Sequence, residues 1–196
     1  MTELHQQITY ILELDKLKAV QRKTLVMADS NRQENSAEHS WHISLLAQVM
    51  QQYAAEPVDI QRVTSMLLIH DIVEIDAGDL FAFACQQDLA AQEIKEHDAA
   101  IRIFGLLPIE QGTATKALWL EFEQAQSADA RFAKAMDRVL PVLQNMDNNG
   151  GSWALHGVQK QQVLARNNYL QVLAPKLWDY VCQQVELAVQ KGWLIE

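Results

Sequence analysis

The chain contains 196 residues, of which 49% are hydrophobic and 21% are charged, and its formal net charge at pH 7 is −9. This composition is typical of one globular domain of ordinary size. The negative charge excludes a broad basic surface that would bind DNA or RNA through the phosphate backbone. The apolar runs are shorter than the roughly 20 residues of a membrane-spanning helix. We therefore expect neither a nucleic acid polymer nor a membrane as partner, whereas one or two arginines in a cleft could still bind a small anionic substrate.

The two cysteines and the N-terminal sequence indicate the cellular compartment. Cys85 and Cys182 lie far apart and match no C-x-x-C spacing, so the sequence suggests neither a disulfide framework nor a thiolate zinc site. The first twenty residues lack the apolar core and the small-residue cleavage site of a secretory signal. We therefore expect that the mature chain begins here and that the protein is cytoplasmic.

Apolar residues recur at helical spacing along nearly the whole chain, and strict alternation bounded by turn residues is missing. We therefore predict an all-α protein. The expected helices of the N-terminal half span about residues 2–19, 36–53 and 60–75. An irregular stretch, residues 27–34, separates the first two. Asn35 and Glu38 form a capping box at the start of the second helix, and Asp59 caps the third.

The C-terminal half is also predicted to be helical. Gly78 ends the third helix, and "DNNGGS" breaks the chain at residues 147–152. The expected helices here span about residues 87–104, a segment that begins at Pro108, a segment from Ser127 to about Met146, residues 157–173 and residues 175–190. Because no internal repeat, low-complexity tract or linker occurs, we expect a single domain over residues 1–196.

Ionisable residues follow the apolar stripe of the third predicted helix, in the stretch "LLIHDIVEIDAGDL". Burial of that helix carries His70 and Asp71 toward the interior or the floor of a cleft. An unpaired buried carboxylate is costly there, and a divalent cation removes this cost. Imidazole and carboxylate ligands together suit Mn, Co, Fe, Zn or similar ions. Two ligands do not complete a site, so further ligands must come from other helices.

Two other predicted helices are rich in apolar residues and carry single ionisable residues. The segment "SAEHSWHISLLAQVM" contains His39 and His42, and "RFAKAMDRVLPVLQNM" contains Asp137 as the acid beside a buried stripe. Glu74 lies three residues after Asp71 and four after His70, so it shares their helical face. A general acid/base role or a role supporting the metal ligands suits it.

These residues carry a resemblance to a known family. "AEHS", then "HD" with "E" three residues later and "GD" after that, then a late "MD", resemble HD-domain metal-dependent phosphohydrolases. Within this family, the sequence resembles the branch that is similar to bacterial 5'-deoxynucleotidases. The resemblance implies an HD-type helical bundle in which His39, His70, Asp71 and Asp137 bind a divalent metal ion. In this branch the metal activates water against a nucleoside 5'-monophosphate.

The resemblance also implies roles for further residues. Asp79, after Gly78, matches an acid near the reacting phosphate or sugar, and would share catalysis with Glu74. Arg22 matches an arginine that holds the substrate phosphate. Lys23 stands where the family's nucleotidases place an aromatic residue. The branch also implies a homodimer.

Several alternatives stay open from the sequence. The ion could be Mn, Co, Mg, Fe, Ni or Zn, and one ion is favoured over two because His97 is the one histidine between Asp71 and Asp137. His42 and Arg32 could join the site or be structural, and Trp41 could lie near the substrate. The stripe Trp178, Val181, Val185 and Val189 could be a partner face or core. The chain could also be a non-catalytic metal- and nucleotide-binding regulator, or a bundle that a metal only holds together.

Overall fold

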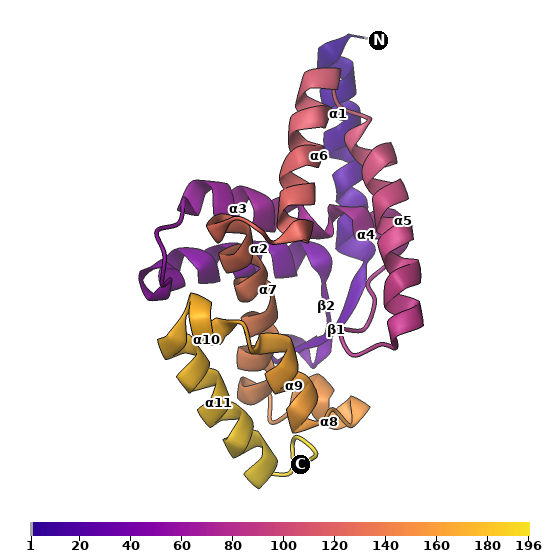
Figure 1. Ribbon diagram of the computed structural model, residues 1–196. Coiled ribbons are helices and arrows are strands. Elements are labelled where there is room, and N and C mark those ends of the chain that lie inside the picture. Colours follow the sequence, from indigo (N-terminus) through magenta and orange to yellow (C-terminus); the bar gives the residue numbers. More distant parts are fainter. Residues whose placement is uncertain (1) are drawn as a thin grey trace.

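The computed structural model describes residues 2–196, and the fold is a bundle of helices with one small sheet (Figure 1). The predicted all-α class is therefore confirmed. The α-helices are α1 (Glu3–Glu13), α2 (Ser36–Met50), α3 (Ile60–Ile69), α4 (Glu74–Ala77), α5 (Gln86–Phe104), α6 (Ile109–Gln124), α7 (Ala128–Asp147), α8 (Gly151–His156), α9 (Lys160–Asn167), α10 (Leu170–Leu173) and α11 (Pro175–Gln190). Helices α1, α5 and α6 run together toward the N-terminal end, and α8 to α11 lie at the opposite end with the C-terminus.

The expected helix starts are present where side chains can accept orphan backbone N–H groups. Asn35 and Glu38 form the predicted capping box of α2, Asp59 caps α3, and Ser127 caps α7. The first predicted helix is α-helical only to Glu13, after which the chain continues as a 3₁₀ helix over Leu14–Ala19.

An antiparallel hairpin that the sequence analysis did not foresee joins α1 to α2. Strand β1 (Gln21–Val26) pairs with β2 (Arg32–Asn35), and the register shifts between Gln21 and Leu25. The turn between the strands contains Ser30 and Asn31 with positive φ angles of 53° and 58°. The strands are mostly polar, so the alternation that reveals a half-buried strand is missing from the sequence.

The third predicted helix is divided in the structure. Helix α3 ends at Ile69, a 3₁₀ turn covers His70–Val73, and α4 follows. The expectation of one helix to about residue 75 was therefore wrong. The tighter turn places His70 and Asp71 at a bend between two helices, and both are buried.

The main hydrophobic core joins α2, α3 and α7 to the C-terminal helices. Val181 and Val185 of α11 are fully buried in it, and Trp178 and Val189 pack against its edge. The stripe on α11 is therefore core. A second cluster joins α1, α5, α6 and the 3₁₀ turn that carries His70. The His70 ring lies 5.0 Å from the ring of Phe122 in the main core, and Trp119 of the second cluster donates a hydrogen bond to the His70 carbonyl, so both clusters help to position the turn.

The C-terminal segments differ from the prediction in two respects. The region expected as one helix over 157–173 forms α9 and α10, and α8 begins inside the expected break at Gly151. Gly157 ends α8 with φ of +60°, a left-handed conformation that glycine adopts without steric cost. None of the described helices has the length and apolar character needed to cross a bilayer.

Candidate metal centre and its cavity

Three segments that are distant in the sequence bring their ionisable side chains together. His39 lies on α2, His70 on the 3₁₀ turn and Asp137 on α7. His39 Nε2 is 3.0 Å from Asp137 Oδ1, and His70 Nε2 is 3.7 Å from the same oxygen. One ligand atom from each of the three residues lies within 4.8 Å of the others. The structure therefore places three of the four predicted metal ligands within reach of a common ion.

The orientation of the two imidazole rings fits a metal site. His70 Nδ1 donates a hydrogen bond to the carbonyl of Leu67 at 2.8 Å. The buried Nε2 of His70 faces Asp71 Oδ1 at 2.9 Å and Asp137 Oδ1 at 3.7 Å without a well-aligned hydrogen bond to either, so this nitrogen points to where a shared ion would lie. The Nδ1 of His39 lies 3.3 Å from Glu34 Oε2, while its Nε2 faces Asp137. A carbonyl or carboxylate behind each ring is the usual arrangement around metal-ligating histidines.

Asp71 lies beside this group. Its Oδ1 is 2.9 Å from His70 Nε2, and its Oδ2 accepts a hydrogen bond from Arg22 Nη1 at 2.7 Å. One carboxylate oxygen thus faces the imidazole that could bind an ion, and the other holds the guanidinium. This position suits the predicted role of Asp71 as a fourth ligand, which stays a prediction.

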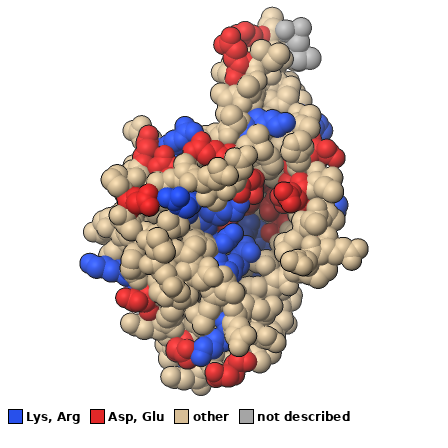
Figure 2. All heavy atoms as spheres, in the orientation of Figure 1, with Lys and Arg blue, Asp and Glu red and all other residues tan. Residues whose placement is uncertain are grey.

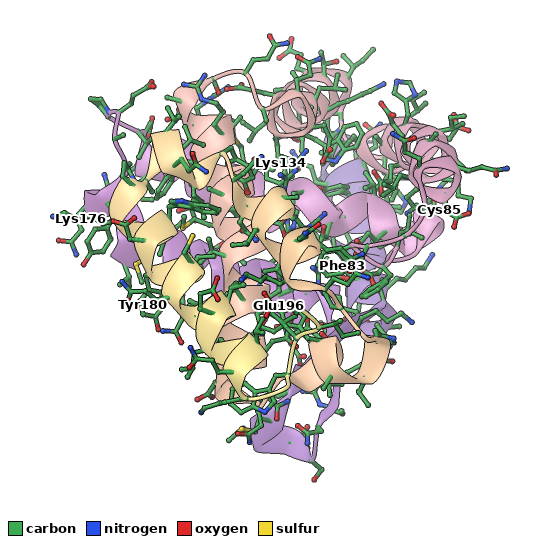
Figure 3. All side chains as sticks on the ribbon, turned by 60° about the horizontal axis from the view of Figure 1, so that its bottom comes forward. Phe83, Cys85, Lys134, Lys176, Tyr180 and Glu196 are labelled. Atoms are coloured by element: carbon green, nitrogen blue, oxygen red, sulfur yellow. The ribbon has the colours of Figure 1, made fainter. Side chains whose placement is uncertain are left out.

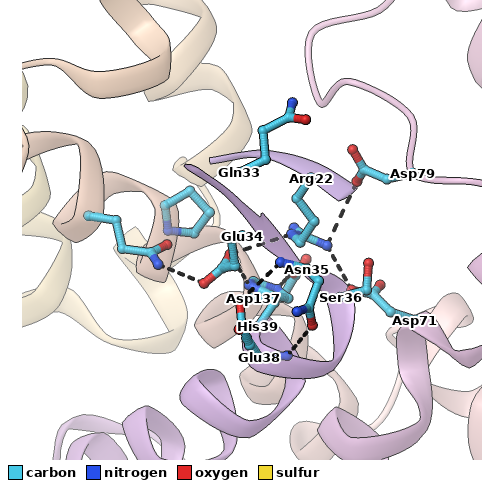
Figure 4. Close-up of polar contacts among 12 residues, drawn as sticks. Arg22, Gln33, Glu34, Asn35, Ser36, Glu38, His39, Asp71, Asp79 and Asp137 are labelled. Atoms are coloured by element: carbon cyan, nitrogen blue, oxygen red, sulfur yellow. Dashed lines mark hydrogen bonds and ion pairs between the residues drawn. The ribbon is translucent and has the colours of Figure 1, made fainter. Parts of the chain in front are cut away.

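Arg22, on β1, is surrounded by carboxylates (Figure 4). Besides Asp71, its nitrogens lie 3.7 Å from Glu34, 4.0 Å from Glu74 and 3.8 Å from Asp79. Burial by itself would lower the pKa of Arg22, but these carboxylates outweigh it and raise the pKa. The arginine therefore stays charged, and its side chain is held beside the histidine and aspartate group.

The two residues predicted to be catalytic have carboxyl groups whose pKa values are raised. Burial and the nearby Asp71 raise the pKa of Glu74 well above its usual value, although Ser36 donates a hydrogen bond to Glu74 Oε2 at 2.5 Å. Burial raises the pKa of Asp79 to about 6, and Arg22 reduces this effect. A carboxyl group with a pKa near neutrality can donate or accept a proton at physiological pH.

The ligand candidates show the opposite behaviour. Burial alone would raise the pKa of Asp137, but the hydrogen bond with His39 and the nearby imidazole of His70 hold it well below its usual value. Burial alone would lower the pKa of His70, but Asp71 and Asp137 raise it well above its usual value. The raised pKa of His70 reports the negative charge of the two aspartates, and the lowered pKa of Asp137 reports the two imidazoles beside it, so each group stabilises the charged form of the other.

The cluster lies at the wall of a cavity of about 620 Å³, a volume within the usual range of small-molecule sites. Figure 2 shows Lys and Arg side chains gathered around a hollow, with Asp and Glu side chains next to them. The charged side chains that line this cavity are Arg22, Lys23, Asp71, Glu74, Asp79, Glu93, Glu96, Glu123, Lys134, Asp137, Arg138 and Arg166. The loop between α4 and α5 adds Phe81 and Phe83, and Figure 3 shows Phe83 and Lys134 near α9.

Other candidates from the sequence lie outside the cavity or at its edge. His42 is exposed, and the Trp41 side chain beside it is 61% exposed. Arg32 forms ion pairs with Asp29 and Glu38 at the surface. His97 lines the cavity on the exposed face of α5. His42, Trp41 and Arg32 are therefore not among the residues that line the cavity.

Sequence reasoning missed functional candidates at two places. Glu34, on β2, is 2% exposed, faces His39 and accepts a hydrogen bond from Gln144 at 2.8 Å. It falls in the stretch expected to be irregular, so nothing marked it as buried. Arg138 and Arg166 also line the cavity. A signal for Arg138 existed, because it directly follows Asp137 in "MDRV".

Comparison with known proteins gives consistent matches. A family model described as HD domain matches residues 14–178. The 5'-deoxynucleotidase HDDC2 of Danio rerio is 26% identical over 141 residues, which cover 72% of this chain and 68% of that protein. HDDC2 of Homo sapiens is 27% identical over 137 residues, with 70% and 65% covered. The alignments thus span about two thirds of these relatives' length.

Solved structures are similar over nearly the whole chain. The structure of a predicted metal-dependent phosphohydrolase from Magnetospirillum magnetotacticum MS-1 is 45% identical, has a TM-score of 0.92, and covers 99% of this chain and 96% of its own. An HD-domain phosphohydrolase from Listeria innocua is 16% identical with a TM-score of 0.63, covering 94% of this chain and 95% of its own. At that identity the second match bears on the fold alone.

Proposed function

The chain belongs to the HD domain family, and on that premise we propose that it hydrolyses a deoxynucleoside 5'-monophosphate with one bound divalent metal ion. The family match confirms the resemblance to HD-domain proteins, and the roles of His39, His70, Asp71 and Asp137 as metal ligands are part of the proposal. At the level of the family the chain is a metal-dependent phosphohydrolase. The deoxynucleotide substrate is the finer part of the proposal.

One observation carries the proposal: His39, His70 and Asp137 form a buried cluster, and His70 and Asp137 of this cluster line a cavity of about 620 Å³. His70 Nε2 has no hydrogen-bond partner, and each ring is supported from behind by a carbonyl or a carboxylate. A bundle that a metal only held together would not need an adjoining cavity with a guanidinium and two acids of raised pKa.

In the proposed mechanism, His39, His70, Asp71 and Asp137 hold the ion. The ion, when bound, polarises a water molecule and neutralises charge on phosphoryl oxygens. Arg22 then holds the substrate phosphate, because a guanidinium matches two phosphate oxygens at once. The carboxylates around Arg22 fix its side chain before the substrate arrives, which lowers the entropic cost of binding.

Glu74 and Asp79 would manage the protons of the reaction. Water attacks the phosphorus and loses a proton, and the 5' oxygen of the nucleoside gains one as it leaves. Glu74 and Asp79 both lie near Nη1 of Arg22, and burial raises the pKa of both. The raised pKa of Glu74 suits a proton donor, and a pKa of about 6 lets Asp79 exchange a proton near neutral pH.

The nucleotide part of the proposal rests on the names of the relatives and on the cavity. The relatives from Danio rerio and Homo sapiens are named 5'-deoxynucleotidases. The cavity walls carry aromatic side chains, including Phe81, Phe83 and Trp153, which offer apolar surface to a base and a sugar. Lys23 lines the same cavity where the resemblance implies an aromatic residue.

The test is a phosphate-release assay with purified protein supplied in turn with Mn, Co and Mg. Deoxynucleoside and ribonucleoside 5'-monophosphates are compared with diphosphates and cyclic nucleotides. We expect metal-dependent release from 5'-monophosphates, with deoxynucleotides preferred. Tight nucleotide binding without release from any member of the panel would instead support a non-catalytic regulator.

A further inference from the structure

Two arginines on one wall of the cavity lack an acidic partner. Of the seven arginines in the chain, five lie within 4.0 Å of a carboxylate: Arg22, Arg32, Arg62, Arg102 and Arg131. Among residues 2–196, no carboxylate lies this close to Arg138, on α7, or to Arg166, on α9. Both of these arginines line the cavity.

The two guanidiniums are held in place by neutral groups. Arg138 Nη1 donates to the backbone carbonyl of Arg166 at 3.1 Å, and its guanidinium lies 4.9 Å from the centre of the Tyr169 ring. Arg166 Nη1 donates to the carbonyl of Ala82 at 3.3 Å. The Nε of Arg138 is buried without a hydrogen-bond partner. These contacts orient the side chains and leave most of their positive charge uncompensated.

Such an arrangement favours an anionic ligand. Both side chains are half-buried at the cavity wall, and partly desolvated charges in proteins are normally paired with a charge of opposite sign. Burial lowers the pKa of Arg166, and Asp137 offsets this only in part, while Arg138 adds to it. The positive charge on this wall therefore calls for an anion supplied from outside the chain.

The surroundings of Arg22 are different. Arg22 has four carboxylates within 4.0 Å, including the proposed metal ligand Asp71. The group around Arg22 suits an ion and one phosphate. The guanidiniums of Arg138 and Arg166 are tied to Tyr169 of α9–α10 and to the loop at Ala82, on the wall formed by the C-terminal helices.

We propose that Arg138 and Arg166 form a second anion subsite, which binds a phosphate group of the substrate other than the one hydrolysed. This inference rests on the proposed function and narrows it to phosphate monoesters that carry a further phosphate, such as a deoxynucleoside 3',5'-bisphosphate. Two guanidiniums match a phosphate dianion in charge, and each offers a planar fork of donors to its oxygens.

The second phosphate takes no part in bond making. Water adds to the phosphorus of the 5'-phosphate, and the bond from that phosphorus to the 5' oxygen breaks. The 5' oxygen takes a proton, so the products are inorganic phosphate and a nucleoside that keeps its 3'-phosphate. The subsite therefore acts through binding and positioning, and its effect is visible in affinity as well as in rate.

The test compares deoxyadenosine 5'-monophosphate with deoxyadenosine 3',5'-bisphosphate. Calorimetry gives the affinity of the metal-loaded protein for each, and phosphate release gives kcat and KM. The variants are Arg138→Gln and Arg166→Gln, with Arg138→Lys and Arg166→Lys to retain the charge. Arg131→Gln is the matched control, because Arg131 lies on α7, pairs with Glu56 at the surface and does not line the cavity.

We expect the wild-type protein to bind the bisphosphate at least about tenfold more tightly, since one charge-assisted hydrogen bond accounts for a difference of that size. Each Gln variant should bring the ratio of bisphosphate affinity to monophosphate affinity toward one. The Lys variants should retain part of this preference, and Arg131→Gln should keep all of it. A wild-type ratio near one, or variants that weaken both ligands equally, would overturn the subsite.

Failure of the proposed function would look different. If neither compound releases phosphate, the hydrolase proposal fails. The ratio of the two binding affinities still tests whether Arg138 and Arg166 form an anion subsite. A preference for the bisphosphate that the Gln variants remove supports the subsite even then, and equal binding of the two compounds overturns it. Circular dichroism of each variant identifies any protein that has failed to fold, and the Lys variants then replace it.

Discussion

His39 and Asp137 lie 98 residues apart in the sequence, yet their side chains approach to 3.0 Å between Nε2 and Oδ1. The contact crosses from α2 to α7, whose apolar faces share the main core. Residues near His39 and Asp137, including Ile43 and Met136, are fully buried in that core. The packing of the bundle therefore brings the polar pair together, and a change at either residue should act on the same site.

Replacement of Asp137 by Asn should remove metal and activity together. The substitution keeps the shape of the side chain but removes the charge that His39 and His70 face. We expect metal affinity to fall by at least about 10–100-fold, the loss that even supporting residues of a metal site cause. Metal analysis of the purified variant and a phosphate-release assay measure both effects.

The matched control for that variant is Asp147→Asn, since Asp147 lies exposed at the end of the same helix. Its metal content and activity should equal those of the wild type. Normal turnover by metal-free Asp137→Asn protein would reject the mechanism.

Replacement of Glu74 by Ala should separate turnover from metal binding. Glu74 contacts Ser36 and lies near Arg22, and it is not a member of the His39, His70 and Asp137 group. We expect the metal content to stay at the wild-type level while kcat falls about 10²–10⁴-fold, the usual contribution of a general acid or base. A parallel loss of metal would show that Glu74 supports the ligands and does not transfer protons.

Replacement of Glu34 by Gln should weaken metal binding from behind His39. The Glu34 carboxylate lies 3.3 Å from His39 Nδ1, and hydrogen bonds from His39 and Gln144 overcome the effect of burial and lower the pKa of Glu34. A neutral amide would support the ring less well, so we expect metal affinity to fall about 10–100-fold. Competition with a chromophoric chelator measures the dissociation constant for the metal ion. An unchanged constant would mean that Glu34 has a structural role in holding β2 and does not support His39 as a ligand.

The contrast between Asp137 and Glu34 shows which part of the site the sequence could predict. His39, His70 and Asp137 each interrupt an apolar helical stripe, so burial of the stripe determined where their side chains would lie. Glu34 belongs to a polar hairpin, and it is buried beside His39 of α2 and Gln144 of α7, contacts that no local sequence pattern records.

The same reasoning explains the remaining differences in the fold. Long amphipathic segments such as α5 and α7 were predicted within a few residues, because their periodicity is clear. The division of the third helix was not predicted, since the apolar stripe continues through the 3₁₀ turn at His70–Val73. Tertiary contacts decide between two helical forms of similar local energy. Arg138 and Arg166 come together through the packing of α7 and α9, which the sequence pattern did not indicate.

Glu96, on the α5 wall of the cavity, predicts a pH dependence of stability. Burial, and then repulsion from Glu123, raises the pKa of Glu96 from 4.5 to about 7. The unfolded state loses its proton first as the pH rises, so the folded state is progressively destabilised between pH 4.5 and pH 7. We expect Glu96→Gln to remove this penalty and to stabilise the protein at pH 8 but not at pH 4.5.

The expected gain at pH 8 is about 1 kcal/mol, because the side chain is only partly buried and solvent screens its charge. Urea denaturation of both proteins at the two pH values measures it. Equal stabilisation at both pH values would indicate a packing effect and would contradict the ionisation of Glu96 as the cause.

The exposed apolar stripe of α1 predicts the oligomeric state. Because α11 packs its stripe into the core of its own chain, that surface is not available to a partner. On α1, Leu4, Ile8, Ile11 and Leu12 share one face and are each about half exposed or more. A continuous apolar surface of this kind is typical of a contact between subunits. We propose a homodimer that packs through α1, and expect light scattering after size exclusion to give twice the monomer mass.

The double substitution Ile8→Lys and Ile11→Lys should then give a monomer. Both side chains are exposed in the chain described here, so their replacement leaves the hydrophobic clusters intact. Circular dichroism should show unchanged helix content, which separates loss of the interface from loss of the fold. If the wild-type protein is a monomer at concentrations of tens of micromolar, the α1 stripe is not a dimer interface and the homodimer proposal is wrong.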